Sequence, residues 1–175
     1  LFEAIVRNFE IQTDAEVSIE IDPRVTSDEK LELLRELGCN RVSLGVQDFD
    51  EQVQKSINRI QPESMTAAML EKCRSLGFKG INFDLIYGLP HQTLASFEKT
   101  LASIVRISPD RIALYNYARL PTLLKHQNIL EKYPMPSAED RVDIVLMSLE
   151  KLTQGGYVAI GMDHFAKTSD DLGIA

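Results

Sequence analysis

Residues 80–121, GINFDLIYGLPHQTLASFEKTLASIVRISPDRIALYNYARLP, decide the fold class of this chain. The stretch 80–90 is typical of a strand that runs into a Gly-Leu-Pro turn. Apolar residues then recur at helical spacing within 94–107, and 111–121 is typical of a second strand. A strand, a helix of more than ten residues and another strand predict a right-handed crossover between two parallel strands.

The same alternation extends in both directions from this unit. Upstream and downstream, the pattern predicts strands at 16–23, 41–49 and 157–165, and helices at 1–9, 27–38, 50–57, 63–76, 123–132 (weak) and 137–154. Ser27 and Ser137 are suited to cap the helices that they precede. The first helix lacks an initiator Met and a capping residue, so we expect the chain to be a piece of something longer.

Two α/β architectures are compatible with this order. An open doubly wound sheet normally carries a Gly-rich phosphate-binding turn after its first strand, and this sequence has none. A (β/α) barrel needs no such turn, but five strands cannot close an eight-stranded barrel. We therefore expect residues 1–175 to form a single domain, a partial (β/α) barrel whose first strands lie outside this chain.

Composition excludes several classes of protein. With 44% hydrophobic residues the chain can bury a core, and no apolar run approaches the ~20 residues of a membrane span. A net charge of −7 argues against a nucleic-acid or anionic membrane partner. Cys39 and Cys73 are too few for a disulfide scaffold, so we expect buried thiols and a cytoplasmic protein.

Polar residues collect where the predicted strands end, which is where barrels of this type carry their functional groups. They are Glu20, Asp22, Gln47, Asp48, Asp84, Asn116, Tyr117, Arg119, Asp163 and His164. Buried parallel strands are normally runs of Val, Ile and Leu, so polar residues there are costly unless they bind something. A ligand rich in hydroxyl or ammonium groups would satisfy them.

Structural roles compete with this interpretation. Asp22 and Asp48 are suited to turns or helix caps, and Glu20 and Asp84 could pair with Arg24 or Arg41 within the sheet. On composition alone Arg59 is a solvated charge, and His164 is equally suited to a buried structural role. The spacing supports no Ser-His-Asp triad, no Walker loop and no zinc site.

Five strings of residues carry more specific information than the pattern of strands and helices. They are SIEIDPR, NRVSLGVQDFD, INFDLIYGLPHQT, PDRIALYNYARLP and GMDHFA. In this order and spacing they resemble the oxygen-independent coproporphyrinogen III dehydrogenase family of radical S-adenosylmethionine (SAM) enzymes, from about Glu16 onward. The strings IEIDP, GVQ and DLIYGLP are similar to a wider group, which includes a haem-trafficking relative, whereas GMDHFA resembles the dehydrogenases themselves.

The resemblance implies an incomplete (β/α)6 barrel and two cofactors, SAM and a [4Fe-4S] cluster. The family's cluster-binding C-x3-C-x2-C loop and its glycine-rich SAM stretch are not among these residues, so we expect this fragment alone to be inactive. Matching the motifs implies that five positions contact SAM: Glu20, Gln47, Arg59, Asp84 and the backbone of Ala118. Arg119 stands where the family often has a histidine, so it could meet a propionate or point outward.

The implied reaction is oxidative decarboxylation of two propionate side chains of coproporphyrinogen III, giving protoporphyrinogen IX in haem biosynthesis. A 5′-deoxyadenosyl radical starts it, so the implied partners are a porphyrinogen and an electron donor or acceptor. The resemblance is compatible with a monomer. Two alternatives stay open: a haem carrier of the same fold, and an unrelated metabolic barrel with a carboxylate pair at its mouth.

Overall fold

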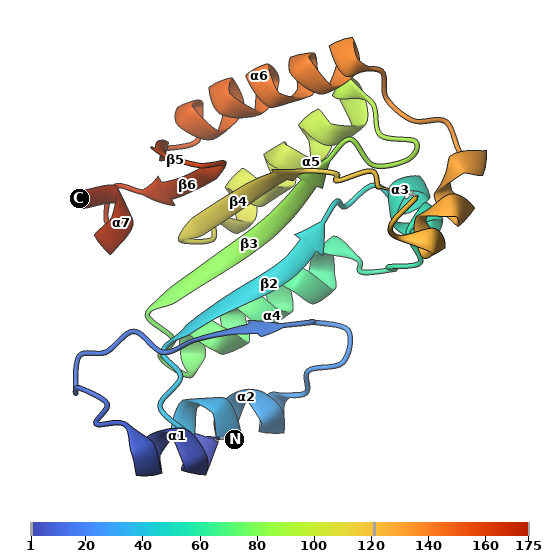
Figure 1. The fold of residues 1–175 in the computed structure, drawn as a ribbon. Helices are drawn as coiled ribbons and strands as arrows, with labels where there is room; N and C mark the ends of the chain where they lie inside the picture. The colour runs from blue at the N-terminus through green and yellow to red at the C-terminus, as the bar shows by residue number, and fades with distance from the viewer. Residues whose placement is uncertain (1, 121, 175) are drawn as a thin grey trace.

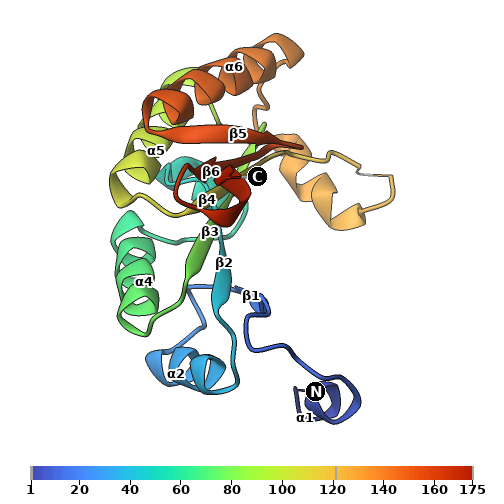
Figure 2. The same ribbon diagram turned by 90° about the vertical axis from the view of Figure 1, so that its left-hand side faces the viewer.

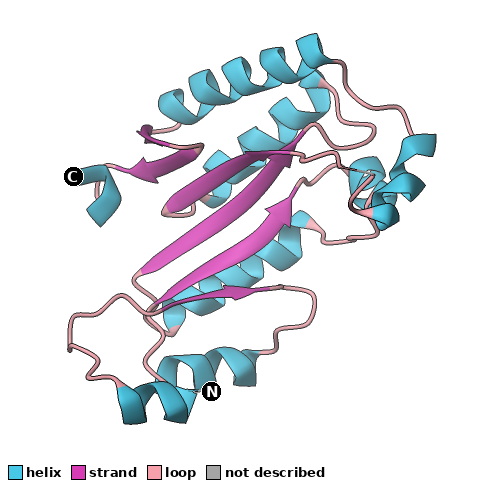
Figure 3. Cartoon of the chain, in the orientation of Figure 1, coloured by secondary structure: helices cyan, strands magenta, loops and turns pink. Residues whose placement is uncertain are grey.

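The computed structural model describes residues 2–120 and 122–174, which form a six-stranded sheet flanked by helices (Figures 1 and 3). In chain order the elements are α1 Phe2–Asn8, β1 Ser18–Ile21, α2 Asp28–Glu36, β2 Arg41–Gln47, α3 Glu51–Ser56, α4 Glu63–Ser75, β3 Gly80–Tyr87, α5 Leu94–Ile107, β4 Arg111–Asn116, the 3-10 helix η1 Lys125–Lys132, α6 Ala138–Gln154, β5 Tyr157–Gly161, β6 His164–Lys167 and α7 Asp171–Ile174. The strand order is β1-β2-β3-β4-β6-β5, and β1 to β4 are parallel. The predicted parallel α/β core is confirmed.

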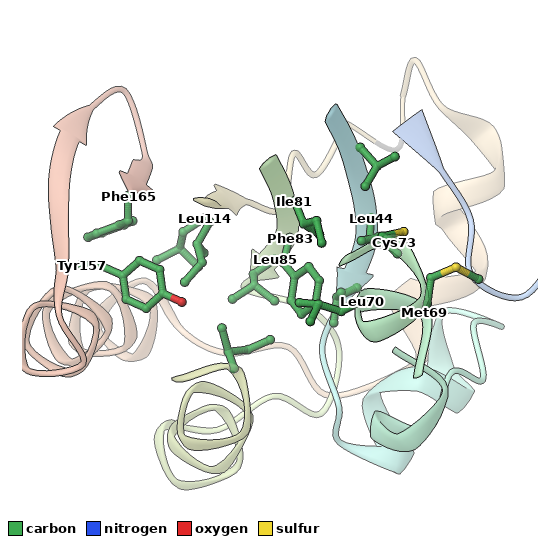
Figure 4. Packing of buried hydrophobic residues seen from close by; sticks show 14 of the residues in the cluster. Leu44, Met69, Leu70, Cys73, Ile81, Phe83, Leu85, Leu114, Tyr157 and Phe165 are labelled. Carbon is green, nitrogen blue, oxygen red and sulfur yellow. The ribbon is translucent and has the colours of Figure 1, made fainter. Parts of the chain in front are cut away.

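Helices α2, α4, α5 and α6 cover one face of the sheet, whereas η1 and α1 lie on its other side (Figure 2). Alternate strand residues point toward these helices and are buried, among them Leu44, Phe83 and Ile112. They pack against apolar side chains from the helices, such as Met69 and Leu70 (Figure 4). Burial of this apolar surface is the main force that holds the helices on the sheet.

The residues between these core positions point to the opposite side, which we call the open face. The strand register aligns Glu20, Ser43, Asn82 and Arg111 in one row across β1 to β4. The next row toward the carboxyl ends of these strands contains Gly45, Asp84, Ala113 and His164. The period of two in β-strands therefore places polar or small groups side by side on this face.

The segment predicted as a single strand at 157–165 is a β-hairpin, which corrects our expectation of five strands. Strand β6 is antiparallel to both β4 and β5. Two residues connect the hairpin, and both have positive φ: 47° at Met162 and 65° at Asp163. Such a pair is the geometry of a type I′ turn. Met and Asp are not the Asn-Gly pair that is typical of such a turn, so the sequence pattern did not predict it.

Two helix predictions also need correction. Residues Lys125–Lys132, predicted as a weak α-helix, form the 3-10 helix η1. Ser27 does precede α2, but its side chain makes no capping hydrogen bond. Ser137 behaves as expected: it accepts from Asp140 N and forms a reciprocal capping box that begins α6.

An ionic cluster joins the carboxyl-terminal segment to the amino ends of the strands. Arg41 Nη1 lies 3.1 Å from Asp170 Oδ2, and Arg111 Nε lies 2.8 Å from Asp170 Oδ1. Glu16 completes the cluster, with Oε2 2.6 Å from Arg41 Nε. The Asp170 side chain is 3% exposed, so its charge depends on these two arginines.

Candidate functional site

The carboxyl ends of the parallel strands bring the predicted site residues to one region of the molecule. Glu20 lies on β1 and Asp84 on β3, both on the open face, and Gln47 ends β2. Arg59 comes from the loop between α3 and α4, and Ala118 follows β4. We call this region the mouth.

Asp84 is held by two neutral neighbours on the open face. Ser43 Oγ donates to Asp84 Oδ2 at 2.7 Å, and Asn82 Nδ2 donates to Asp84 Oδ1 at 2.8 Å. Asn82 Nδ2 also lies 2.8 Å from Ser43 Oγ. The carboxylate is thereby oriented without being neutralised, so it can accept further hydrogen bonds from a ligand. Sequence reasoning missed Ser43 and Asn82, although Asn82 alternates with Asp84 along the strand.

Glu20 lies exposed on the same face. Within the described part of the chain, neither Glu20 nor Asp84 forms an ion pair. The alternative in which these carboxylates pair with Arg24 or Arg41 is therefore wrong: Arg24 binds Asp22, and Arg41 binds the cluster around Asp170. Two acidic groups remain on the open face without a cation bound to them.

Arg59 lies at the other side of the mouth and is only 18% exposed. Its Nη1 donates to Asp22 Oδ2 at 3.2 Å, and its Nη2 donates to the Gly45 carbonyl at 2.6 Å. Arg24 also binds Asp22, and this hydrogen bond lowers the pKa of the Asp22 carboxyl to about 2. One carboxylate thus faces two guanidinium groups, which leaves a net positive corner beside Gln47. Arg59 is a partly buried residue of the mouth, not a solvated charge.

Gln47 adopts an uncommon backbone conformation, with φ of 68°. Asp48 N donates to Val46 O across it at 2.9 Å. This three-residue hydrogen bond around a positive φ is the pattern of a γ-turn, a rare and strained arrangement. The turn shifts the register between β2 and β3 and leaves the buried Gln47 Oε1 without a hydrogen-bond partner among the described residues. Strain and an unsatisfied buried acceptor both indicate a functional position.

Gly45 makes room for the side chains that surround it. A Cβ atom at this position would lie 2.8 Å from Gln47 Nε2 and 3.0 Å from Arg59 Nη2. The close approach of both side chains to the strand therefore requires glycine here.

We expect Gly45→Ala to weaken the binding of SAM, the cofactor that the sequence resemblance implies, about fivefold, equivalent to about 1 kcal/mol, because the methyl group displaces the ends of two flexible side chains. The matched control is Gly80→Ala, whose methyl group would collide with the Arg41 guanidinium at the opposite end of the strands. That control should lower the unfolding temperature and leave the affinity unchanged. Calorimetric titration with SAM and thermal unfolding measure the two effects. Equal affinity losses in both variants would refute the local role of Gly45.

The backbone after β4 is fixed by Gln127 of η1. Gln127 Nε2 donates to Ala118 O at 2.9 Å, and Gln127 Oε1 accepts from Leu120 N at 2.7 Å. This pairing holds Ala118 beside a hollow of about 570 Å³, which Gln47, Ile86 and Gln127 help to line. The Ala118 carbonyl already accepts one bond, and a carbonyl oxygen has capacity for a second. Arg119, next in the chain, is exposed.

Tyr115 and His164 line the far side of the open face. Their rings meet edge to face with centroids 5.9 Å apart. His164 Nδ1 lies 2.6 Å from the Met162 carbonyl, so this nitrogen donates and Nε2 is the acceptor in the neutral ring. Burial and the nearby Asp84 carboxylate raise the pKa of Tyr115. Both residues belong to the site surface rather than to the apolar core.

The residues 2–120 and 122–174 contain no group of three or more His, Cys, Asp or Glu side chains that could hold a metal ion. Cys39 and Cys73 are unpaired and buried, as expected, and burial raises the pKa of the Cys73 thiol to about 11. These cysteines do not fit an iron–sulfur cluster. Across the same two ranges, no helix is long and apolar enough to cross a bilayer.

Comparison with known proteins identifies the class. The model of the radical SAM superfamily matches residues 1–104, and the chain belongs to that superfamily. Along all 175 residues it is 46% identical to the oxygen-independent coproporphyrinogen III oxidases of Salmonella typhimurium and Synechocystis, and it spans 38% of the length of each. The crystal structure of the Escherichia coli coproporphyrinogen III oxidase, a radical SAM enzyme, matches 99% of the chain at 44% identity and a TM-score of 0.95, with 40% of that enzyme covered. The predicted partial barrel is confirmed.

Proposed function

We propose that the protein carrying this chain decarboxylates two propionate side chains of coproporphyrinogen III oxidatively and forms protoporphyrinogen IX in anaerobic haem biosynthesis. The observation that supports this is the 46% identity along the whole chain to proteins named for that activity. Residues 1–175 would act as one domain of the barrel core, in the cytoplasm, where unpaired thiols such as Cys39 and Cys73 persist.

The charges at the mouth fit SAM, which is implied by the superfamily. Glu20 and Asp84 form an acidic side of the mouth, and Arg59 with Arg24 and Asp22 forms a net positive corner. SAM carries a carboxylate, an ammonium, a sulfonium and two ribose hydroxyls, so a site with separated charges of both signs suits it. The unsatisfied Gln47 Oε1 adds an acceptor between these two regions.

We assign the contacts by this complementarity. Asp84 and Glu20 accept hydrogen bonds from hydroxyl or ammonium groups, and Gln47 offers both an acceptor and a donor. Arg59 binds the methionyl carboxylate: its hydrogen bonds to other described residues use two of the five N–H groups of a guanidinium. The Ala118 backbone accepts or donates at the remaining edge of the cofactor.

SAM held by the residues of the mouth would supply radical chemistry for the decarboxylation when it is bound together with a reduced [4Fe-4S] cluster. The residues of this chain bind and orient the cofactor and keep water away from the reacting atoms. The partners of the whole protein would be the porphyrinogen and an electron donor or acceptor, and a monomer would suffice for this chemistry.

The experiment is anaerobic turnover of coproporphyrinogen III by the full-length protein with SAM and a reductant. We expect protoporphyrinogen IX together with methionine and 5′-deoxyadenosine, measured by chromatography. Stable haem binding without decarboxylation would instead support a carrier of the same fold. Turnover that needs neither iron nor SAM would refute radical chemistry altogether.

A further inference from the structure

A fully buried carboxylate lies directly behind the mouth. Asp48 is 0% exposed and follows Gln47 in the chain. Its Oδ1 accepts from Thr100 Oγ1 and, at 2.9 Å, from Asp50 N; its Oδ2 accepts from Gln92 Nε2 at 2.6 Å. Among the residues that the structure describes, no Lys or Arg pairs with it. Turn formation, the structural role open to Asp48 from the sequence, accounts for the bond to Asp50 alone.

Gln92 links Asp48 by hydrogen bonds to the turn that follows β3. Its Oε1 accepts from Gly88 N at 2.6 Å and from Leu89 N at 3.3 Å, and its Nε2 also donates to Ile86 O at 3.0 Å. Gln92 is 3% exposed. The Asp48–Gln92 pair therefore joins the end of β2 to the end of β3.

A second branch leads from Asp48 to Arg59. Gln54 Nε2 donates to Asp48 O at 2.9 Å and to Gln61 O at 2.7 Å, while Gln54 Oε1 accepts from Gln61 N at 2.9 Å. Arg59 N in turn donates to Gln54 O at 2.8 Å. This branch starts at the main-chain carbonyl of Asp48, so the Asp48 carboxylate acts on the Arg59 loop only by fixing the position of residue 48.

Stability alone does not explain a carboxylate here. Burial raises the pKa of Asp48, because desolvation disfavours its charged form. Replacing buried ionic groups by well-packed apolar ones is often neutral or stabilising. What the carboxylate provides is two acceptor oxygens that collect donors from three separate segments. Those donors hold the chain next to Gln47, whose positive φ needs support from its surroundings.

We propose that Asp48 and Gln92 are positioning residues that hold the γ-turn at Gln47 and the Arg59 loop in the geometry that binds SAM. This inference rests on the proposed SAM site. It adds to that site two buried residues that act through Gln47 and Arg59 without touching the cofactor.

The test begins with Asp48→Asn in the full-length protein. The amide nitrogen introduced at position 48 would face Gln92 Nε2, so two hydrogen-bond donors would meet. If the Gln92 amide rotated by half a turn to avoid this, its Nε2 would face Gly88 N and Leu89 N, which are also donors. We expect the SAM Kd, measured by equilibrium dialysis, to rise about five- to tenfold. The double variant Asp48→Asn/Gln92→Glu exchanges amide and acid and restores a donor–acceptor match between the two side chains, but it leaves Ile86 O facing a carboxylate oxygen, so we expect it to recover only part of the lost affinity.

Two further variants separate positioning from folding. Tyr157→Phe removes another buried hydrogen bond, from Tyr157 Oη to Pro109 O, and should lower the unfolding temperature without changing the SAM Kd. If Asp48→Asn does not yield folded protein, Gln92→Met tests the same pair and should also raise Kd at least fivefold. Unchanged SAM affinity in a folded Asp48→Asn or Gln92→Met protein would overturn the inference. Because Kd is read without turnover, a failure of the proposed reaction would appear separately, as wild-type protein that binds SAM but does not decarboxylate the porphyrinogen.

Discussion

Asp84→Ala in the full-length protein should weaken SAM binding about 10- to 100-fold. The change removes charge-assisted hydrogen bonds worth about 1.5 to 3 kcal/mol. The fold should survive, because Ser43 Oγ and Asn82 Nδ2, which lose their acceptor, lie on the open face rather than among the helices. Calorimetric titration gives the affinity, and visible absorption with electron paramagnetic resonance reports on the cluster.

The cluster signal should remain intact in this variant, because Asp84 is assigned to the cofactor and not to iron. Asp84→Asn is the matched control: it keeps the size of the side chain and one acceptor, so its affinity should fall less. Loss of iron in Asp84→Ala, or wild-type affinity in both variants, would show that the role assigned to Asp84 is wrong.

Arg41→Met should lower the free energy of unfolding by about 3 kcal/mol, toward the lower end of the effect of breaking a buried ion pair. The reason is that Asp170, 3% exposed, would keep only Arg111 as a cationic partner among the described residues, and Glu16 would lose its close contact. Urea unfolding followed by circular dichroism measures the loss. SAM affinity should change little, since Arg41 lies at the opposite end of the strands from the mouth.

A compensating variant tests this explanation. Arg41→Met/Asp170→Leu removes both charges, so the buried carboxylate no longer lacks a partner, and much of the stability should return. Asp170→Leu alone should be destabilising, because two arginines would then face each other. A double variant less stable than either single variant would mean that packing, not charge pairing, explains the cost.

Sequence reasoning succeeded where periodicity and topology act together. Glu20 and Asp84 alternate with apolar neighbours on parallel strands, so the period of two places them on one face and the shared strand direction places them at one edge. The same reasoning located Gln47 at a strand end. These are consequences of backbone geometry and need no knowledge of which side chains touch.

Sequence reasoning failed where contacts between residues far apart in the chain determine the partner of a charged group. Nothing local to Arg41 points to Asp170, 129 residues away, and nothing near Arg59 points to Asp22. Charged groups have many alternative partners of similar energy in an unfolded chain, so composition cannot select among them. Sequence reasoning missed the network of Asp48 for a similar reason: two of its donors, Gln92 and Thr100, are 44 and 52 residues away along the chain.

The tip of the β5–β6 hairpin, at Met162 and Asp163, is a suitable position for a spectroscopic label. Because β6 runs against β4, the tip projects at the same edge as the mouth, and Met162 there is 92% exposed. Both thiols of residues 1–175 are buried, so within this part of the protein a cysteine introduced by Met162→Cys would be the one that a maleimide dye reaches readily. A fluorophore at that point could report ligand arrival in real time while the interior stays untouched.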